Sequence, residues 1–225
     1  MLFPAGYGRQ TMAVTEITID TLPVLFESVA REFEEKKELL CEMDARMGDG
    51  DLGLTMSKGY GALPQLIRDQ TDPSNIGKTL MKAGMKMSGV VPSTMGTLMS
   101  SGIMSGGKAL NGKTAIGAPE MAVFLIAFAE GLQKRGKCQP GDRTIYDAMK
   151  PAGDRAKEKA EAGGSLGDVI SAALDGANAG VAATKEMVPK YGKAAVFAAK
   201  AKGTEDQGAV AGRCLIEGLA RYILA

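Results

Sequence analysis

The chain has 225 residues, 27 basic and 26 acidic side chains, and a formal net charge of +1. This balance argues against a nucleic-acid-binding protein with a broad basic face, and the longest apolar run, Met121–Ala129, is too short to span a bilayer. The three cysteines form no CxxC pair, which favours reduced thiols and a cytoplasmic location. Histidine is absent, so the usual general base and the usual transition-metal ligand are both missing.

Helical periodicity dominates the chain. The first stripe of apolar residues runs from Leu22 to Phe33 at i, i+3, i+4 spacing. Further helices are expected over 55–68, over 75–90, around Leu125 with an end near Gly136, over 143–162, from Ile170 to Val181, and from Val210 to Ile223. Convincing alternating strands are missing. The predicted fold is therefore an all-α bundle formed by one domain.

The expected domain covers residues 12–225. Residues 1–11 have neither the basic segment nor the apolar segment of a signal peptide, and we interpret them as an N-terminal extension. Between the helices, glycine-rich or acidic loops are expected over 43–54, 88–118, 136–144 and 190–208. Ordered loops on a helical scaffold are a favourable place for a ligand.

Two known sequence motifs match this chain but occur in the wrong structural context, and a third matches only in part. Gly107 to Thr114 fits the P-loop pattern, but no buried strand precedes it, and Pro119 would disrupt the helix that has to follow. The pattern Gly48-x-Gly50-x-x-Gly53 fits the dinucleotide fingerprint, but it follows a charged segment and contains carboxylates that would repel a pyrophosphate. A calcium loop starting in the same segment would need its closing glutamate at Tyr60.

The segment MDARMGDGDLGLTM, residues 43–56, crowds Asp44, Asp49 and Asp51 together. At a separation of roughly 5 Å and an effective dielectric near 20, each like-charged pair would cost about 3 kcal/mol. A polar turn or a helix cap explains any one of these aspartates, but it does not explain three. Mg²⁺ prefers carboxylate oxygens together with substrate phosphates, and the interleaved glycines would let backbone amides approach those phosphates. The sequence therefore predicts a metal site.

The same segment, read as D-x-x-x-G-D-x-D-x-G, resembles the nucleotide-binding L subunit of the dihydroxyacetone kinases, which is the C-terminal domain in fused enzymes. RGKCQPGDRTIYD, residues 135–147, is similar to the family's RGKxxPGDKTxxD segment. Gly192-Lys193-Ala194 and Asp206-Gln207-Gly208-Ala209 resemble its later GRA and DPGA elements. The resemblance extends from about Leu22 to the C-terminus.

This resemblance implies a barrel of about eight antiparallel helices with a nucleotide, ADP or ATP, bound at one loop end. It also implies that Asp44, Asp49 and Asp51 hold two Mg²⁺ ions that bridge the nucleotide phosphates. The residues expected along the nucleotide are Leu52, Gly53, Leu54 and Thr55 at the phosphates, Thr94 and Met95 in a glycine- and serine-rich loop, Gly136 and Ile145 at the adenine, and Lys193, Asp206, Gln207 and Gly208 closing over it.

The residues alone leave alternatives at several of these positions. Met95 and Ile145 are also typical of a hydrophobic core, and Lys193 is equally consistent with a solvated loop. Asp142 has the position of an N-cap for a helix that starts at Arg143, so it is not assigned to the site.

Departures from the family pattern concern nucleotide choice, nucleotide exchange and the acceptor. Leu52 stands where related proteins carry histidine or cysteine, Gln207 replaces a proline, and the loop over 92–100 keeps only Gly96 of the family's GGxSGPLYG. None of these changes removes a predicted metal ligand.

The resemblance implies a phosphoryl-transfer subunit in which the aspartates act as metal ligands. Its acceptor would be dihydroxyacetone or a related short ketose held by a separate K-type subunit through a histidine adduct. The donor would be ATP, which Leu52 favours, or a phosphotransferase-system phosphoprotein that recharges bound ADP. Neither a nucleic acid nor a membrane is an expected partner, and a homodimer is left open. A nucleotide-binding adaptor without turnover and an unrelated all-α metal protein are the alternative readings.

Overall fold

The structure is a computed structural model that describes residues 13–197 and 201–225. The predicted N-terminal extension, residues 1–11, lies outside the described residues. Within them the α-helices are α1 (Leu22–Glu35), α2 (Lys37–Ala45), α3 (Leu52–Asp69), α4 (Ile76–Val90), α5 (Thr94–Ala109), α6 (Ala118–Gly136), α7 (Tyr146–Glu161), α8 (Leu166–Ala183) and α10 (Gln207–Ile223). Two short 3₁₀ helices cover Thr184–Glu186 and Lys193–Phe197.

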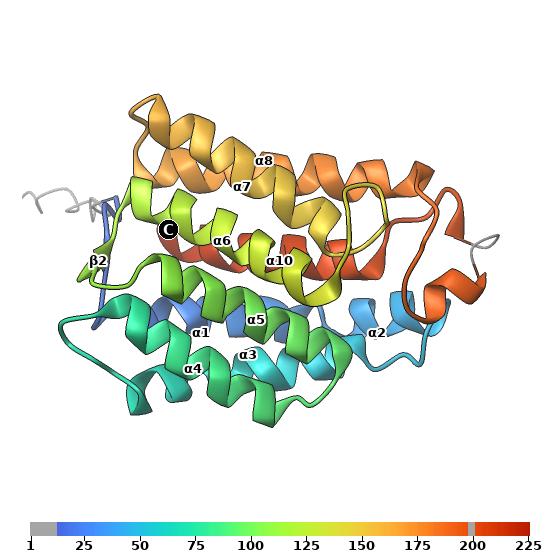
Figure 1. Cartoon of the computed structure of the whole chain (residues 1–225), viewed down its shortest axis with the longest axis horizontal. Coiled ribbons are helices and arrows are strands. Elements are labelled where there is room, and N and C mark those ends of the chain that lie inside the picture. The colour runs from blue at the N-terminus through green and yellow to red at the C-terminus, as the bar shows by residue number, and fades with distance from the viewer. Residues whose placement is uncertain (1–12, 198–200) are drawn as a thin grey trace, which may run out of the picture.

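The long helices form a closed ring. Each packs against the next along the chain, except that α2 is a short side element and α1 packs directly on α3; α10 then packs on both α8 and α1. Neighbouring long helices run in opposite directions, so α3, α5, α7 and α10 begin at one end of the barrel, while α1, α4, α6 and α8 begin at the other (Figure 1). The predicted all-α barrel of about eight antiparallel helices is confirmed. We call the end that carries α2 the cavity end, and the opposite end the far end.

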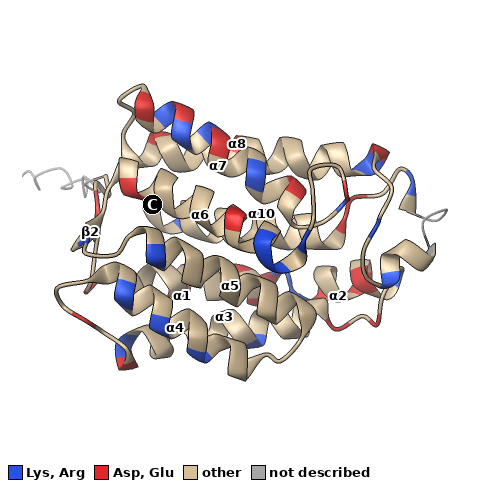
Figure 2. Ribbon diagram, in the orientation of Figure 1, with Lys and Arg blue, Asp and Glu red and all other residues tan. Residues whose placement is uncertain are grey.

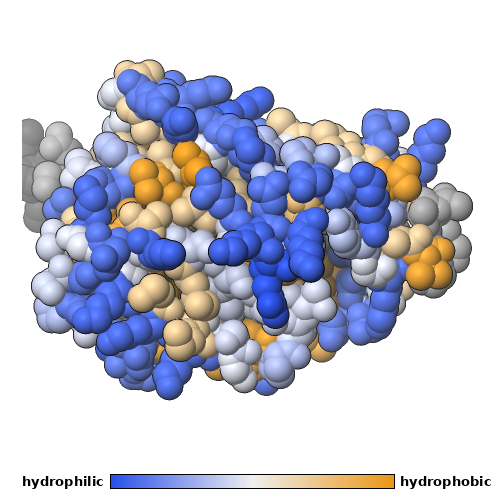
Figure 3. All heavy atoms as spheres, viewed as in Figure 1, coloured by the Kyte–Doolittle hydropathy of each residue, from blue (hydrophilic) through white to orange (hydrophobic). Residues whose placement is uncertain are grey.

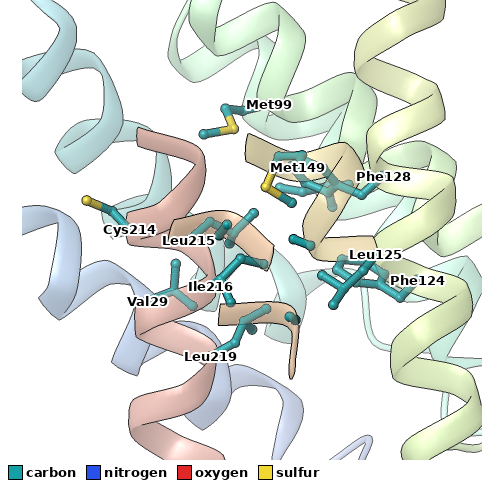
Figure 4. Packing of buried hydrophobic residues seen from close by; sticks show 14 of the residues in the cluster. Val29, Met99, Phe124, Leu125, Phe128, Met149, Cys214, Leu215, Ile216 and Leu219 are labelled. Carbon is teal, nitrogen blue, oxygen red and sulfur yellow. The ribbon is translucent and has the colours of Figure 1, made fainter. Parts of the chain in front are cut away.

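Apolar side chains fill the interior of the ring. Figure 4 shows Val29 of α1, Leu125 and Phe128 of α6, and Leu215 and Ile216 of α10 meeting inside it, all of them buried. At roughly 25 cal/mol per Å² of apolar surface removed from water, this interior is the main source of stability. The core explains why the periodic stripes in the sequence located most of the helices.

The predicted loop over 88–118 is wrong over most of its length, because residues 94–109 form α5. Its glycines suggested a loop, but two of them are there for close packing. A Cβ added to Gly102 would lie 2.7 Å from the ring of Phe128, and one added to Gly106 would lie 2.4 Å from Phe124. Tertiary packing therefore overrides the poor helix propensity of glycine.

Three further boundaries differ from prediction. Helix α3 starts at Leu52, inside the predicted loop over 43–54, and α7 starts at Tyr146 rather than at residue 143. The predicted loop over 190–208 contains a 3₁₀ helix and the first two residues of α10. Two short strands were not predicted: β1 (Ile17–Thr18) pairs antiparallel with β2 (Ala115–Ile116) at the far end.

The face shown in Figure 3 is mostly hydrophilic, with apolar side chains in small separate patches. None of the described helices combines the length and the apolar character that crossing a membrane requires.

Candidate functional site

The segment that we call the aspartate loop, residues 44–51, joins the last turn of α2 to α3 at the cavity end. Asp44 lies in the last turn of α2, Asp49 in the turn, and Asp51 immediately before α3. Each offers a carboxylate oxygen, and these oxygens all lie within 4.8 Å of one another. Asp44 also shapes the loop, because its Oδ2 accepts the backbone N–H groups of Gly50 (2.9 Å) and Asp51 (3.2 Å). Gly50 permits the turn through its left-handed backbone, at φ 77°.

Cationic and amide groups already face these carboxylates. The Lys193 ammonium lies 2.6 Å from Asp49 Oδ2, and this hydrogen bond lowers the pKa of Asp49 and raises that of Lys193. The carboxylates of Asp51 and Asp44 raise the pKa of Lys193 further. Gln207 Nε2 donates to Asp44 Oδ1 over 3.4 Å, while Gln207 Oε1 is buried and has no hydrogen-bond partner among the described residues.

The chemistry of this donor set fits a divalent cation. Three carboxylates supply hard oxygen atoms of the kind that Mg²⁺ binds, and an ammonium group already occupies the position of a counter-ion beside one of them. The unsatisfied Gln207 oxygen supplies a further acceptor at the same place, and a buried acceptor without a donor is unfavourable until a ligand or water satisfies it. The residues present therefore suit a metal that arrives with its own water or anionic ligands.

The aspartate loop forms one side of a cavity of about 490 Å³, within the range usual for small-molecule sites. The N-termini of α3, α5 and α10 also line it. Ser93 caps α5 by accepting the N–H of Gly96 (3.0 Å), and Asp206 caps α10 by accepting that of Ala209 (2.8 Å). At α3, by contrast, Asp51 makes no side-chain cap bond. Its first-turn amides and the positive end of its dipole are thus available to an anion.

A segment that we call the strap, residues 187–197, forms another wall and is tied down at three points. The Lys190 N–H donates to the Asp142 carbonyl (3.2 Å), and its ammonium contacts Asp142 Oδ1 at 2.6 Å. Tyr191 Oη donates to the carbonyl of Lys137 (2.8 Å), and Lys193 contacts Asp49. The strap thereby links the loop between α6 and α7 to the aspartate loop, as the ribbons at the right of Figure 1 show.

Asp142 does not cap α7, so the predicted N-cap is wrong. The helix begins three residues later than that role requires. The carboxylate of Asp142 instead accepts from Gln139 N (2.7 Å) and pairs with Lys190, and the bond to Lys190 holds its pKa below the usual value. Asp147 organises the same turn, since its two oxygens accept the N–H groups of Gly141 and Thr144. Both carboxylates therefore shape this loop from within.

Arg143 is a buried part of the cavity wall that the sequence did not single out. Its guanidinium donates to the carbonyls of Thr184 (3.1 Å), Ala201 (3.1 Å) and Thr204 (2.9 Å), and its backbone is left-handed at φ 61°. Close by, burial raises the pKa of Asp206 to about 6, against the opposing effect of the Arg143 charge. The guanidinium thus holds the segments before and after the strap against the α6–α7 loop.

A second cavity of about 1030 Å³ adjoins the first. Ser93, Thr94, Leu98, Thr144, Ile145, Tyr191 and Gly192 line both. The second cavity extends to the C-terminal end of α6, where Gly136 and Cys138 form its wall. A ligand longer than the first cavity would therefore extend between α5, α6 and the strap.

Most of the sequence-predicted residues come together here. Those that line the first cavity are Asp44, Asp49, Asp51, Leu52, Thr55, Thr94, Met95, Ile145, Lys193, Asp206, Gln207 and Gly208. Gly136 lines the second cavity but not the first. Gly53 and Leu54 line neither: Gly53 is packed so tightly that an added Cβ would lie 1.9 Å from the Lys37 carbonyl oxygen, and Leu54 is 58% exposed. Ile145 is both a core residue and a cavity wall.

Sequence reasoning missed Ser93, Leu98, Arg143, Thr144 and Tyr191. Ser93 carried a signal that could have found it, because a serine three residues before Gly96 fits an N-cap. Leu98 lies on α5, in a segment that was expected to be a loop. Arg143, Thr144 and Tyr191 become cavity residues only through the folding of loops that have no periodic pattern.

Figure 2 shows both charge signs in the loops of the cavity end, which fits the pairing of Lys190 and Lys193 with aspartates. Charged residues also occur along the helices, where pairs such as Lys150–Asp154 are exposed. Exposed pairs of this kind contribute little to stability.

Comparison with known proteins places this arrangement in a family. The DAK2 domain profile matches residues 46–221. The chain is 31% identical over 176 residues to the ADP-binding subunit DhaL of PEP-dependent dihydroxyacetone kinase 2 from Listeria innocua, covering 78% of this chain and 81% of that protein. It is 30% identical over 202 residues to L-erythrulose 1-kinase from Mycolicibacterium smegmatis, covering 88% of this chain and 34% of that one.

The fold is also similar to a solved structure. The dihydroxyacetone kinase from C. freundii, crystallised with AMP-PNP and Mg²⁺, superposes with a TM-score of 0.68 at 22% identity, covering 99% of this chain and 37% of that one. This chain thus spans about a third of the length of the two larger relatives. The likeness at this identity establishes the shared fold.

Proposed function

The chain belongs to the DAK2 domain family, and within it we propose that this protein is the nucleotide-binding subunit of a dihydroxyacetone-type kinase. One observation carries the proposal. In a single cavity, the uncapped N-terminus of α3 attracts anions, while three carboxylates next to it repel them. A nucleotide di- or triphosphate with divalent cations satisfies both groups, because the cations lie between the carboxylates and the phosphates.

Asp44, Asp49 and Asp51 are the proposed ligands of two Mg²⁺ ions. When bound, these ions neutralise phosphate oxygens and the charge that develops on the transferring phosphoryl group. The three aspartates act as ligands and not as bases. Asp44 has a second task, since Oδ2 holds the backbone of the loop while Oδ1 faces Gln207.

The remaining residues bind and orient the nucleotide. The proposed donors to the phosphates are the backbone amide of Leu52 and the side-chain hydroxyl of Thr55, both in the first turn of α3, together with the N-terminal turns of α5 and α10. The Thr55 amide itself is bonded to the Asp51 carbonyl (2.9 Å). Lys193 lies close enough to the carboxylates to exchange Asp49 for a phosphate oxygen. The apolar residues shared by the two cavities, Leu98 and Ile145, provide the surface for the nucleoside.

Transfer of the phosphoryl group requires a partner. The chain has no histidine, so it cannot form the histidine adduct through which the family's K-type subunit holds a ketose. We therefore propose a K-type partner that docks at the cavity end, with dihydroxyacetone or another short ketose as the acceptor. Similarity to both a dihydroxyacetone kinase subunit and an L-erythrulose kinase supports this substrate class.

The first test is thermal stability of nucleotide-free protein with Mg²⁺–ADP, with ADP plus chelator, and with Mg²⁺ alone. Ligand at about a hundred times its Kd adds roughly 2.7 kcal/mol, which for a domain of this size raises Tm by about 5–10 °C. We expect this shift only with metal and nucleotide together. No shift under any condition would overturn the proposal.

Turnover is tested separately, with ATP, Mg²⁺, dihydroxyacetone and an active K-type subunit. Formation of the sugar phosphate supports the kinase subunit. Binding of the nucleotide without any product would instead favour a nucleotide-binding adaptor, the reading suggested by the altered segment over 92–100.

A further inference from the structure

Tyr191 stands where the two cavities meet. It belongs to the residues that line both, and within the described parts of the chain no other aromatic side chain lines either of them. The residues of the first cavity that are absent from the second include the three aspartates and Gln207, whereas Leu132, Arg135 and Gly136 line the second alone. Tyr191 therefore lies between the acidic part of the first cavity and the part of the second cavity that α6 lines.

Its ring is held in place from both ends. The hydroxyl donates to the Lys137 carbonyl at 2.8 Å. The backbone is fixed one residue earlier, where the N–H and the ammonium of Lys190 both bind Asp142. The ring has few torsions to lose on binding, and these contacts restrict them in advance.

The ring is nevertheless partly exposed to solvent. Tyr191 is 44% exposed, although its hydroxyl is already paired and needs no water. The apolar side chains of Leu98 and Ile145 also line both cavities. A flat, partly apolar ligand between these residues and Tyr191 would remove the exposed ring from water.

Resting on the proposed function, we propose that Tyr191 stacks on the nucleobase and so makes the site prefer a nucleoside diphosphate to inorganic diphosphate. The strap then has two separate contacts with the ligand region: Lys193 at the phosphate end and Tyr191 at the nucleoside end. Stacking needs a π-face and no particular edge, so Tyr191 favours nucleotides as a class, without selecting among bases.

The proposal is tested by calorimetric titration of nucleotide-free protein with Mg²⁺–ADP and, separately, with Mg²⁺–pyrophosphate. The variants are Tyr191→Leu, which removes the ring, and Tyr191→Phe, which keeps the ring and removes the hydroxyl. Val196→Ala is the matched control, because Val196 lies on the strap, is 80% exposed, and lines neither cavity.

We expect Tyr191→Leu to weaken Mg²⁺–ADP binding about tenfold and to leave Mg²⁺–pyrophosphate binding within about twofold. Tyr191→Phe and Val196→Ala should leave both affinities within about threefold of the unmodified protein. If Tyr191→Leu weakens both ligands equally or neither of them, or if Tyr191→Phe weakens ADP as much as Tyr191→Leu does, the stacking proposal is overturned. Failure of the unmodified protein to bind either ligand would instead overturn the proposed function.

Discussion

The two ends of the barrel differ in what lies against the N-termini of their helices. At the far end, Asn75 accepts from Lys78 N (2.8 Å) at α4 and Ser165 accepts from Asp168 N (3.2 Å) at α8. Glu120 accepts the N–H of Gly117, the residue before α6 (3.3 Å), and α1 begins without a side-chain cap bond. At the cavity end, α3 and α7 begin without a side-chain cap bond. Ser93 and Asp206 cap the other two helices that begin there, α5 and α10. Both ends thus have capped and uncapped helices, and the difference is that the first turn of the uncapped α3 lines a cavity, where its free amides can meet a ligand.

Backbone strain follows the same division. Within the described residues, the two non-glycine positions with positive φ are Lys137 and Arg143, both in the α6–α7 loop of the cavity end. Such conformations cost on the order of 1–3 kcal/mol each and persist where the surroundings hold them. At Arg143 the guanidinium contacts supply that hold. The cavity end thus gives up some stability for the shape of the site.

The largest expected effect is on binding, from Asp49→Asn. The change keeps the size of the side chain and removes the charge of a proposed metal ligand, so the affinity for Mg²⁺–ADP should fall about a hundredfold or more, beyond the 10–100-fold typical of outer-shell changes. Asp154→Asn is the matched control, because Asp154 is also an exposed aspartate paired with a lysine.

Calorimetric titration of both variants with Mg²⁺–ADP measures the difference. The control should bind as the unmodified protein does, and circular dichroism should give the same helix content for all three. Retained affinity in Asp49→Asn would remove this residue from the metal site.

The next effect is on the pH dependence of the free energy of unfolding, which should differ in sign between Asp206 at the cavity end and Asp168 at the far end. Burial raises the pKa of Asp206 to about 6, so the folded state binds more protons than the unfolded state between about pH 4 and pH 6. The contribution of Asp206 to the free energy of unfolding therefore falls as pH rises through this window, by roughly 3 kcal/mol at 1.36 kcal/mol per pKa unit. Asp206→Asn should remove this loss while keeping the helix cap.

Asp168, at the far end, has the opposite sign. Hydrogen bonds from Ser165 lower its pKa, so its stabilising contribution is present above the unfolded pKa and is lost as pH falls. Urea unfolding from pH 4 to pH 8 distinguishes the two. Asp206→Asn should stabilise the protein near neutral pH and Asp168→Asn should not; an unchanged pH profile in Asp206→Asn would show that this buried carboxyl does not titrate as described.

The sequence predicted most of the helices because they depend on periodic apolar stripes, such as the one from Leu22 to Phe33, whereas the closing of these helices into a barrel was implied by the family resemblance. It failed at α5, where glycines such as Gly102 and Gly106 serve close packing against aromatic rings that come from α6. No local pattern carries that information, because the partner lies elsewhere in the chain.

The candidate site divides in the same way. The aspartates could be found because three carboxylates in one short segment are unfavourable without a cation. Arg143 and Tyr191 could not, since their roles depend on contacts with Thr184 and Lys137, which only the folded loops bring near. Gly53 and Leu54 were placed at the phosphates by position in the motif, and their side-chain positions lie outside both cavities.

A smaller effect should distinguish stability from binding at the far end. Asn75→Ala removes the cap of α4 and two further bonds, to Asn111 and to the Gly112 N–H. The loss should be about 1–2 kcal/mol in the free energy of unfolding, measured by urea titration, with Mg²⁺–ADP affinity unchanged. A decrease in affinity larger than about threefold would contradict the separation of the two ends.

The smallest effect should come from Gln207→Leu, and its sign is informative. In the ligand-free protein the amide makes one long bond to Asp44 and leaves Oε1 buried without a partner. Replacing a poorly satisfied polar group by an apolar one of similar size is close to neutral or slightly stabilising, so Tm should change by no more than about 1–2 °C. With Mg²⁺–ADP the same variant should show a smaller ligand-induced rise in Tm than the unmodified protein, because it lacks the amide oxygen that the ligand or its water would satisfy. A clear loss of stability without ligand, together with a full ligand-induced rise in Tm, would instead make Gln207 a structural residue of the α10 N-terminus. At least one polar group of the cavity end would then be satisfied by the protein alone, without a ligand.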